Sequence, residues 1–343
     1  MKERDYSIDI IRGILMILVV LGHGLEFLRK ENGFTAFLYN FIYFFHMPVF
    51  VFITGFLSKN IKKGRNRAVQ TYFVPFLLFN IIWSVITLLS SYFTDTSKLN
   101  SNASAYFTFF TPGWALWFML SVFLWKIFLP DIVRIKNAFV VTLIIGLLSG
   151  LFVEFGAFMS LARTITFLPY FLAGYYCSSD HITNIRSKSK LWSILVFLAG
   201  GLITYIYGNV LKLPSEMLWG DRSYNHYIEQ MLPALLITMV RYIVGFAFIF
   251  ALINVIRGNN KVFAKIGANT LSVYFMHTYL VGPLMAGAGY IKNPFLQLAV
   301  ICAGAFLITL ILSSAPVARG FHKVIERLNS FIFKKDTVTG SSN

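Results

Sequence analysis

The chain has 343 residues, of which 57% are hydrophobic, 17% are aromatic and only 13% are charged. Its mean hydropathy is +0.68. A water-soluble protein could not bury this much apolar surface beneath so few polar residues, so the composition excludes a soluble enzyme and a disordered chain. We therefore predict an all-α fold, a polytopic helix bundle in a membrane.

The N-terminal segment is predicted to be a membrane helix and not a removable signal peptide. Its apolar run begins at Ile8, contains Asp9 and Arg12, and is followed by no small-residue cleavage site. The two cysteines, Cys177 and Cys302, lie in separate apolar stretches. They indicate neither a disulfide framework nor a metal cluster.

About ten apolar segments are long enough to cross a bilayer, at roughly 20 residues per helix. Charged and turn-rich stretches separate one segment from the next. The predicted spans are 8–28, 36–58, 69–92, 113–129, 138–156, 160–178, 191–210, 233–256, 268–290 and 294–316.

Basic residues set the orientation of these spans, because Lys and Arg are retained on the cytoplasmic side. With the N-terminus inside, the cytoplasmic segments include the basic stretches 59–67, 186–190, 257–265 and 319–335. We therefore expect both termini to be cytoplasmic. This topology accounts for the formal net charge of +16 without a nucleic-acid partner.

The chain is predicted to be one integral membrane domain, residues 1–335, with a disordered tail over 336–343. No internal repeat divides it. The longest loops on the outer side, about 93–112 and 211–232, are polar but too short to form a separate domain.

Ionisable side chains cluster in the first span. An ionisable group inside a membrane costs about 2.5–3.5 kcal/mol even on a lenient scale, so each requires an explanation. At about 100° per residue, Asp9, Arg12 and His23 lie on one face of a helix, with His23 roughly 16 Å further out than Arg12. One interpretation is an Asp9–Arg12 ion pair at the interface with a structural histidine. The other is an anion-binding group connected to a deeper acid or base.

Two other histidines lie within predicted spans. His46 precedes Pro48, which frees a backbone carbonyl and is tolerated where a cavity or a neighbour satisfies the helix. His277 lies in the ninth span. Each is either a structural group that forms a hydrogen bond in the bundle or a candidate substrate ligand.

Candidates also lie near the predicted outer surface. Trp114 and Trp117 begin the fourth span, where tryptophans commonly anchor the interface. Glu154 and Arg163 stand near the outer ends of the fifth and sixth spans. They could pair structurally, or Arg163 could orient an oxyanion or a sugar hydroxyl. Arg241 is a further intramembrane arginine.

Several kinds of chemistry lack their motifs in this chain. It has no phosphate-binding Gly-rich loop, no Gly-x-Ser-x-Gly and no His-Glu-x-x-His, and no metal-ligand spacing, so no metal cofactor is expected. Base catalysis with charge stabilisation is what the remaining residues suggest.

A series of separated motifs resembles the acyltransferase-3 family of integral membrane acyltransferases. The Arg12-x10-His23 spacing is similar to the family's hallmark, and Arg4 and Asp9 precede it. Further similar segments lie in the second, fourth, sixth and ninth spans, and together they cover almost the whole chain: Phe44-Phe45-His46-Met47-Pro48 with Thr54-Gly55-Phe56, Leu116-Trp117-Phe118, Arg163 with Phe167-Leu168-Pro169-Tyr170-Phe171, and Gly267 through Thr270-Leu271-Ser272-Val273-Tyr274 to His277. The sixth-span segment is most similar to the fucose 4-O-acetylase-like branch.

This resemblance implies a multi-pass protein of the bacterial plasma membrane that takes an acyl group from acetyl-CoA. The acceptor would be a hydroxyl of a cell-surface glycan or of its lipid-linked sugar precursor. The resemblance also implies that His23 is essential, and that Arg12, with Arg4 nearby, binds the donor. We expect Asp9 to support Arg12.

Among the remaining candidates, Arg163 or an indole of Trp114 or Trp117 would stabilise the oxyanion or bind the sugar. Trp117, His46, Glu154 and His277 are the substrate-binding candidates.

Two other functions fit the same residues. A proton-coupled transporter or flippase would use them as a relay, although the chain lacks the paired broken segments typical of inverted repeats. A structural subunit of polysaccharide assembly would need no chemistry. The sequence does not distinguish acetyl from succinyl, or a polysaccharide from a small glycoside. It also leaves the oligomeric state open, a homo-oligomer included.

Overall fold

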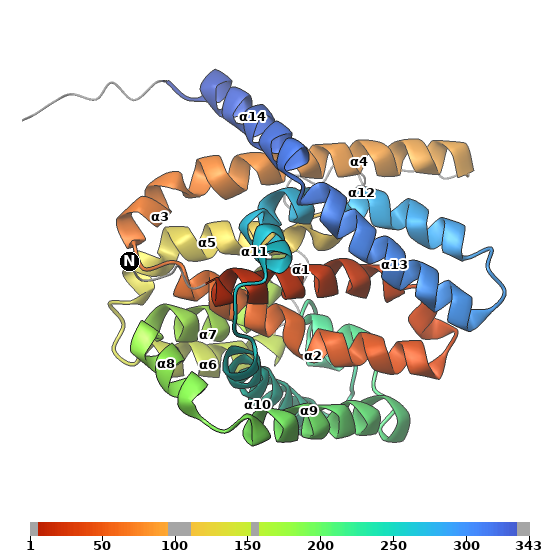
Figure 1. The fold of residues 1–343 in the computed structure, drawn as a ribbon. Coiled ribbons are helices and arrows are strands. Elements are labelled where there is room, and N and C mark those ends of the chain that lie inside the picture. The colour runs from red at the N-terminus through yellow and green to blue at the C-terminus, as the bar shows by residue number, and fades with distance from the viewer. Residues whose placement is uncertain (1–5, 95–110, 152–157, 335–343) are drawn as a thin grey trace, which may run out of the picture.

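The fold is a bundle of helices, as the sequence predicts. A computed structural model describes residues 6–94, 111–151 and 158–334, and within these ranges the chain forms helices and no strands (Figure 1). The longer helices are α1 Ser7–Leu25, α2 Gly33–Phe56, α4 Val74–Thr94, α5 Trp117–Ile132, α6 Ala138–Leu148, α7 Leu161–Tyr176, α9 Lys190–Tyr205, α10 Met231–Val255, α12 Thr270–Ala288, α13 Pro294–Leu312 and α14 Ala315–Ile332. Shorter helices are η1 Leu28–Lys30, α3 Ile61–Ala68, η2 Val69–Phe73, η5 Trp114–Leu116, η6 Ser149–Leu151, η8 Phe158–Ser160, α8 Ser179–Ser187, η9 Ile206–Val210, η10 Ser215–Trp219, η11 Tyr224–His226 and α11 Lys261–Ala268.

Each predicted span coincides with a helix, and the polytopic membrane bundle is confirmed. Seven helical segments of the described chain are long and apolar enough to cross a membrane: Ser7–Leu25, Gly33–Phe56, Ile61–Ser90, Trp114–Ile132, Lys190–Val210, Met231–Val255 and Pro294–Leu312. The other three predicted spans correspond to α6 with η6, to α7 and to α12, which are shorter or more polar. In α12 the polar residues Thr270, Ser272, His277 and Thr278 are buried inside the protein.

Four additional helices lie in the basic loops that the sequence assigns to the cytoplasm. They are α3, α8, α11 and α14. Helix α14 is amphipathic: Phe321 and Ile325 are buried, whereas Lys323, Glu326 and Arg327 are exposed. Figure 1 places α3, α8 and the start of α1 at the same end of the bundle, which we call the basic end. The predicted tail, 336–343, lies outside the described residues.

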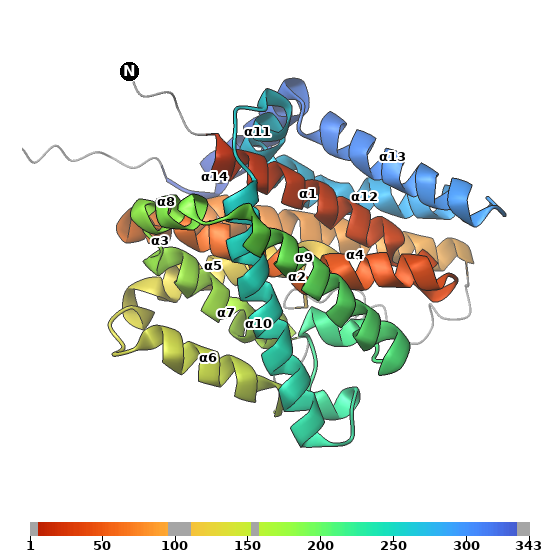
Figure 2. The same ribbon diagram turned by 60° about the horizontal axis from the view of Figure 1, so that its bottom comes forward.

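Helix α1 lies at the centre of the bundle. It packs against α2, α11, α12 and α13 (Figures 1 and 2). Gly13 and Gly267 allow α1 and α11 to touch, because a Cβ on Gly267 would collide with the backbone oxygen of Asp9 and one on Gly13 with that of Phe263. Such small residues let membrane helices approach closely. The contact between α1 and α11 sets the position of the charged residues of α1 along the axis of the bundle.

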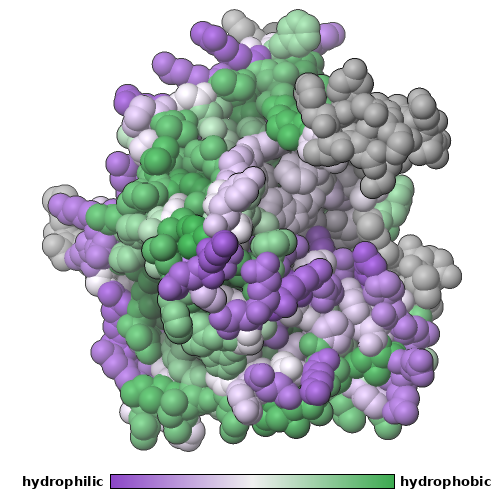
Figure 3. Space-filling view, turned by 90° about the vertical axis from the view of Figure 1, so that its right-hand side faces the viewer, coloured by the Kyte–Doolittle hydropathy of each residue, from purple (hydrophilic) through white to green (hydrophobic). Residues whose placement is uncertain are grey.

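The outer surface of the bundle suits a bilayer. Large apolar side chains are exposed along α9 and α13, among them Trp192, Leu198, Leu202, Leu307 and Ile311. Figure 3 looks onto the end opposite the basic end, where hydrophilic residues gather across the middle of the face and hydrophobic residues lie at its lower and left-hand edges. Polar groups therefore gather where the bundle would meet water.

The contact between α1 and α11 predicts the effect of Gly267→Ala. Alanine favours a helix over glycine by about 1 kcal/mol, but here its methyl group would push the two helices apart, at a cost of about 1–3 kcal/mol. The thermal unfolding temperature of the purified protein in detergent should fall. Gly201→Ala on α9 is the matched control, because its Cβ would meet no atom within 4 Å. Equal stability of the two variants would contradict the packing argument.

Candidate functional site

Several residues singled out in the sequence meet around one small cavity, which we call the His23 cavity. Its volume is about 70 Å³. The wall combines ionisable and aromatic side chains from α1, α2, α5, α7, α12 and the segment that carries η10. They include His23, Glu26, His46, Trp114, Trp117, Arg163, Trp219 and Tyr274.

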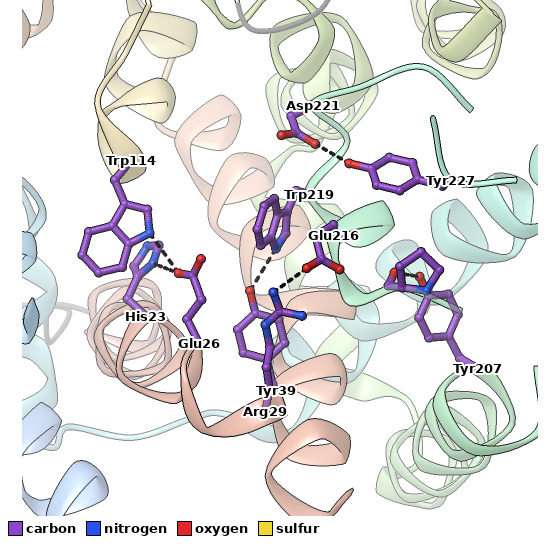
Figure 4. A network of polar contacts seen from close by, with 11 residues as sticks. His23, Glu26, Arg29, Tyr39, Trp114, Tyr207, Glu216, Trp219, Asp221 and Tyr227 are labelled. Carbon is purple, nitrogen blue, oxygen red and sulfur yellow. Dashed lines mark hydrogen bonds and ion pairs between the residues drawn. The ribbon is translucent and has the colours of Figure 1, made fainter. Parts of the chain in front are cut away.

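His23 stands beside a carboxylate that the sequence analysis did not single out. Glu26 Oε2 lies 3.6 Å from His23 Nδ1 and accepts a 2.9 Å hydrogen bond from Trp114 Nε1. The Trp114 ring meets the His23 ring edge-on, with centroids 4.8 Å apart. Figure 4 shows the three side chains turned toward one another. This arrangement orients the imidazole and directs its Nδ1 at a negative charge.

Glu26 is a carboxylate at neutral pH. It follows the last residue of α1. His23 and the indole N–H of Trp114 both contact this carboxylate and stabilise its charged form. A negative charge therefore lies beside the His23 imidazole.

Trp114 is held in a strained backbone conformation. Its φ is 34°, in the left-handed region that residues other than glycine usually avoid. The Gly113 amide before it donates a 2.8 Å hydrogen bond to Asn80 Oδ1 of α4. Strain of this kind often marks a functional site. Here the indole is directed toward Glu26 and lines the His23 cavity.

The other two histidines differ in their access to the cavity. His46 Nδ1 donates a 2.7 Å hydrogen bond to the backbone oxygen of Ile42, which leaves Nε2 as an acceptor, and its ring lines the cavity. His277 Nδ1 likewise donates to the Tyr274 oxygen, at 2.7 Å. Its ring is fully buried behind His23, with ring centroids 5.3 Å apart. This geometry suits contact with a substrate for His46 and support of His23 for His277.

Arg163 forms an ion pair that the sequence did not predict. The sequence suggests a pair with Glu154, but that residue lies outside the described part of the chain. In the structure Arg163 Nη2 contacts Asp221 Oδ2 at 3.3 Å, and the guanidinium lies 5.2 Å from the Trp117 ring centre. Arg163 is thus directed into the cavity by a carboxylate from a distant loop.

That loop, residues 211–230, is held at the His23 cavity by an ion pair and hydrogen bonds. Arg29 Nη2 contacts Glu216 Oε1 at 2.6 Å, and Trp219 Nε1 donates to the Tyr39 hydroxyl at 2.9 Å (Figure 4). Arg241, the third intramembrane arginine, donates from Nη1 to the Met217 oxygen at 2.8 Å. Arg241 therefore has a structural partner. The loop brings Trp219 to the wall of the cavity.

A second cavity, which we call the Arg12 cavity, lies nearer the basic end. Its volume is about 140 Å³. Arg12 donates a 2.7 Å hydrogen bond to Thr270 Oγ1 and lies 3.3 Å from Asp9 Oδ1. Lys126 also lines it and donates a 2.6 Å hydrogen bond to Ser58 Oγ. Because Asp9 balances Arg12 and the described residues give Lys126 no carboxylate partner, the cavity carries net positive charge.

Tyr274 separates the two cavities and lines both of them. Its hydroxyl donates to the Ala115 oxygen. Thr270, Tyr274 and His277 follow one another at helical spacing along α12, opposite Arg12 and His23 of α1. The predicted stripe on α1 therefore faces a matching stripe on α12.

The structure gathers only part of the predicted site around His23. His46, Trp117 and Arg163 line the His23 cavity. Arg12 lies eleven residues, or roughly 16 Å, further along the axis of α1, and Asp9 lies fourteen residues, or roughly 21 Å, along it. Arg4 lies outside the described residues. Sequence reasoning missed four residues: Glu26, Lys126, Trp219 and Tyr274. Glu26 had a signal, because it is three residues after His23 and shares its helix face, and Lys126 is a cation inside an apolar span.

Comparison with known proteins is consistent with this geometry. A family model described as an acyltransferase domain, of the acyltransferase-3 type, matches residues 5–314. The chain is 30% identical over 243 residues to nodulation protein NolL of Sinorhizobium fredii, a match that covers 61% of each chain. It is 29% identical over 244 residues to nodulation protein NolL of Mesorhizobium japonicum, which covers 63% of this chain and 61% of that one.

These matches span about three fifths of the relatives' length. No solved structure matches the chain. The family model covers nearly all of the sequence, however, and includes both cavities. The chain therefore belongs to the acyltransferase-3 family and is a multi-pass membrane protein.

Proposed function

We propose that this protein is an O-acyltransferase of the bacterial plasma membrane that moves an acetyl group from cytoplasmic acetyl-CoA to a sugar hydroxyl. The acceptor is a cell-surface polysaccharide or its lipid-linked precursor on the outer side. The observation that carries the proposal is the pair of cavities with different chemistry. One is cationic and faces the basic end, the other contains a carboxylate and histidine, and Tyr274 lies between them.

The Arg12 cavity suits the donor. Coenzyme A is polyanionic, and Arg12 and Lys126 place positive charge where its phosphates would enter from the cytoplasm. The Asp9 carboxylate holds Arg12 in position. The distance of roughly 16 Å along α1 between Arg12 and His23 is then spanned by the pantetheine arm.

The His23 cavity suits the acceptor and the reaction. Glu26 favours the tautomer of His23 with its proton on Nδ1, so that Nε2 is the free base. Tryptophans 114, 117 and 219 line the cavity, and flat aromatic rings suit the apolar faces of sugars. Arg163 is the cation nearest the reacting groups, and the Trp114 indole is already bonded to Glu26.

The chemical step follows from these roles. His23 Nε2 takes the proton of the sugar hydroxyl as its oxygen attacks the thioester carbonyl carbon, and Arg163 stabilises the oxyanion of the tetrahedral intermediate. The intermediate collapses, the carbon–sulfur bond breaks, and the imidazolium returns its proton to the departing thiolate. The products are the O-acetyl sugar and coenzyme A. Asp9 acts through Arg12 and has no contact with the reacting atoms.

The proposal is tested with a deletion strain complemented by wild-type protein or by His23→Ala. Loss of the base should lower acetyl transfer by about 10²–10⁴-fold. The O-acetyl content of the surface polysaccharide, measured by proton NMR before and after mild base, should return only with the wild type. In parallel, the purified wild-type protein in detergent should release coenzyme A from acetyl-CoA without any ion gradient.

Two results would contradict it. Full restoration of O-acetyl groups by His23→Ala, at equal protein abundance, would remove His23 from the reaction. If deletion leaves the polysaccharide unchanged and the purified protein consumes no acetyl-CoA, the donor and acceptor are wrong and a transporter becomes the better interpretation.

The Glu26 carboxylate should matter through its charge. Glu26→Gln preserves size and an acceptor for Trp114 but removes the charge beside His23. The carboxylate stabilises the imidazolium that forms during transfer, so without its charge the transfer rate should fall roughly 10- to 100-fold. Glu31→Gln is the control, because Glu31 is exposed and outside the cavity. A Glu26→Gln variant as active as the control would show that His23 needs no carboxylate.

Substitution of Trp219 should weaken binding of the acceptor and leave binding of the donor unchanged. Truncation by Trp219→Ala opens the wall of the His23 cavity and should weaken the apparent affinity for acceptor by roughly tenfold, about 1.4 kcal/mol. The surface O-acetyl content should fall while acetyl-CoA binding to the purified protein is unchanged. Trp192→Ala provides the control, since Trp192 is exposed on α9. Weaker acetyl-CoA binding by Trp219→Ala would argue against the assignment of the donor and the acceptor to separate cavities.

A further inference from the structure

A large groove at the basic end is not used by the reaction described above. It runs between α14 on one side and α3, η2 and the start of α4 on the other, and its volume is about 890 Å³. A hydrogen bond of 3.1 Å from Asn329 Nδ2 to the backbone oxygen of Gln70 joins the two sides. We call it the α3–α14 groove.

The groove continues toward the Arg12 cavity. Leu271 lines both, and Tyr72 of the Arg12 cavity follows Thr71 of the groove. Gly64 brings α3 against the Lys126 side chain, because a Cβ there would lie 3.4 Å from Lys126 Cδ. Groove, Arg12 cavity and His23 cavity therefore form a series in which each neighbouring pair shares a residue, first Leu271 and then Tyr274.

The groove has the chemistry of a nucleotide site. Lys63 and Arg67 supply cations, and neither has an ion-pair partner among the described residues. Phe321 is almost wholly buried beneath the groove, and the exposed ring of His322 is the aromatic group on which a base can stack. Glu326, the carboxylate of the groove, would repel a phosphate but is a common acceptor for a ribose hydroxyl.

We propose that the α3–α14 groove binds the phosphorylated nucleoside end of the acyl donor, with its 3′-phosphate at Lys63 and Arg67. This inference rests on the proposed function. It divides the donor into three parts: the nucleoside 3′-phosphate in the groove, the pyrophosphate at Arg12 and Lys126, and the thioester beside His23. An anionic lipid headgroup offers similar phosphate chemistry, so the experiment must distinguish the two.

The test compares coenzyme A with 3′-dephospho-coenzyme A, which lacks only that phosphate. Binding is measured by calorimetry on the purified protein in phosphatidylcholine nanodiscs. Wild-type protein should bind coenzyme A about tenfold more tightly, because charge-assisted contacts to phosphate are strong. The double variant Lys63→Gln/Arg67→Gln should lose this preference and bind both ligands with similar affinity.

A matched double variant controls for net charge. Lys62→Gln/Arg327→Gln removes two exposed cations of α3 and α14 that do not line the groove, and it should keep the wild-type preference. Unchanged binding of dephospho-coenzyme A by Lys63→Gln/Arg67→Gln shows that this variant is folded.

Three results would overturn the inference. The first is equal binding of the two ligands by the wild type, which leaves the proposed function standing if acetyl-CoA is still consumed. The second is loss of preference in both double variants, since general charge then explains it. The third is a wild type that retains phosphatidylglycerol and shows no preference for coenzyme A over 3′-dephospho-coenzyme A, together with a Lys63→Gln/Arg67→Gln variant that loses the lipid. That result would assign the groove to a lipid headgroup. If the wild type neither binds coenzyme A nor consumes acetyl-CoA, the proposed function fails with it.

Discussion

The arrangement of this protein depends on how α1 buries its ionisable residues. Asp9, Arg12, His23 and the adjoining Glu26 cannot face lipid without a large cost, so the helix turns them inward. That face needs polar partners at matching heights, and α12 supplies Thr270 opposite Arg12 and His277 opposite His23. The other helices then surround α1, which explains why it is central. The central position of α1 and the polar lining of the two cavities thus have the same cause, which is the row of ionisable residues on one face of α1.

The division between the two cavities has a chemical reason. A thioester is most useful when water cannot reach it before the acceptor does, and closed sites exclude such side reactions. Tyr274 closes the space between the cavities, and its hydroxyl is bonded to the Ala115 oxygen beside Trp114. In the proposed reaction, the donor's pantetheine arm must displace or pass this ring to reach His23. Tyr274 therefore lies at the boundary between the proposed donor site and the proposed acceptor site.

The sequence predicted the fold well and the site in part, for physical reasons that differ. Hydropathy and charge bias are local, so the helices and the stripe of Arg12 and His23 could be found from spacing alone. Contacts between distant segments leave no such periodicity. The Arg163–Asp221 pair and the place of Trp219 depend on how the 211–230 loop folds back, and no pattern within that loop indicates it. Glu26 could have been found from its spacing to His23.

The strongest constraint on the acceptor comes from the 211–230 loop. A loop in water is usually mobile, yet Arg29, Tyr39, Arg163 and Arg241 all hold this one down. Binding of a flexible glycan costs conformational entropy, and a wall that is already ordered adds nothing further to that cost. A preformed aromatic wall thus favours recognition of a sugar face over enclosure of the whole polymer. This suits the proposed reaction, in which one hydroxyl of a long glycan chain is modified and the chain is then released.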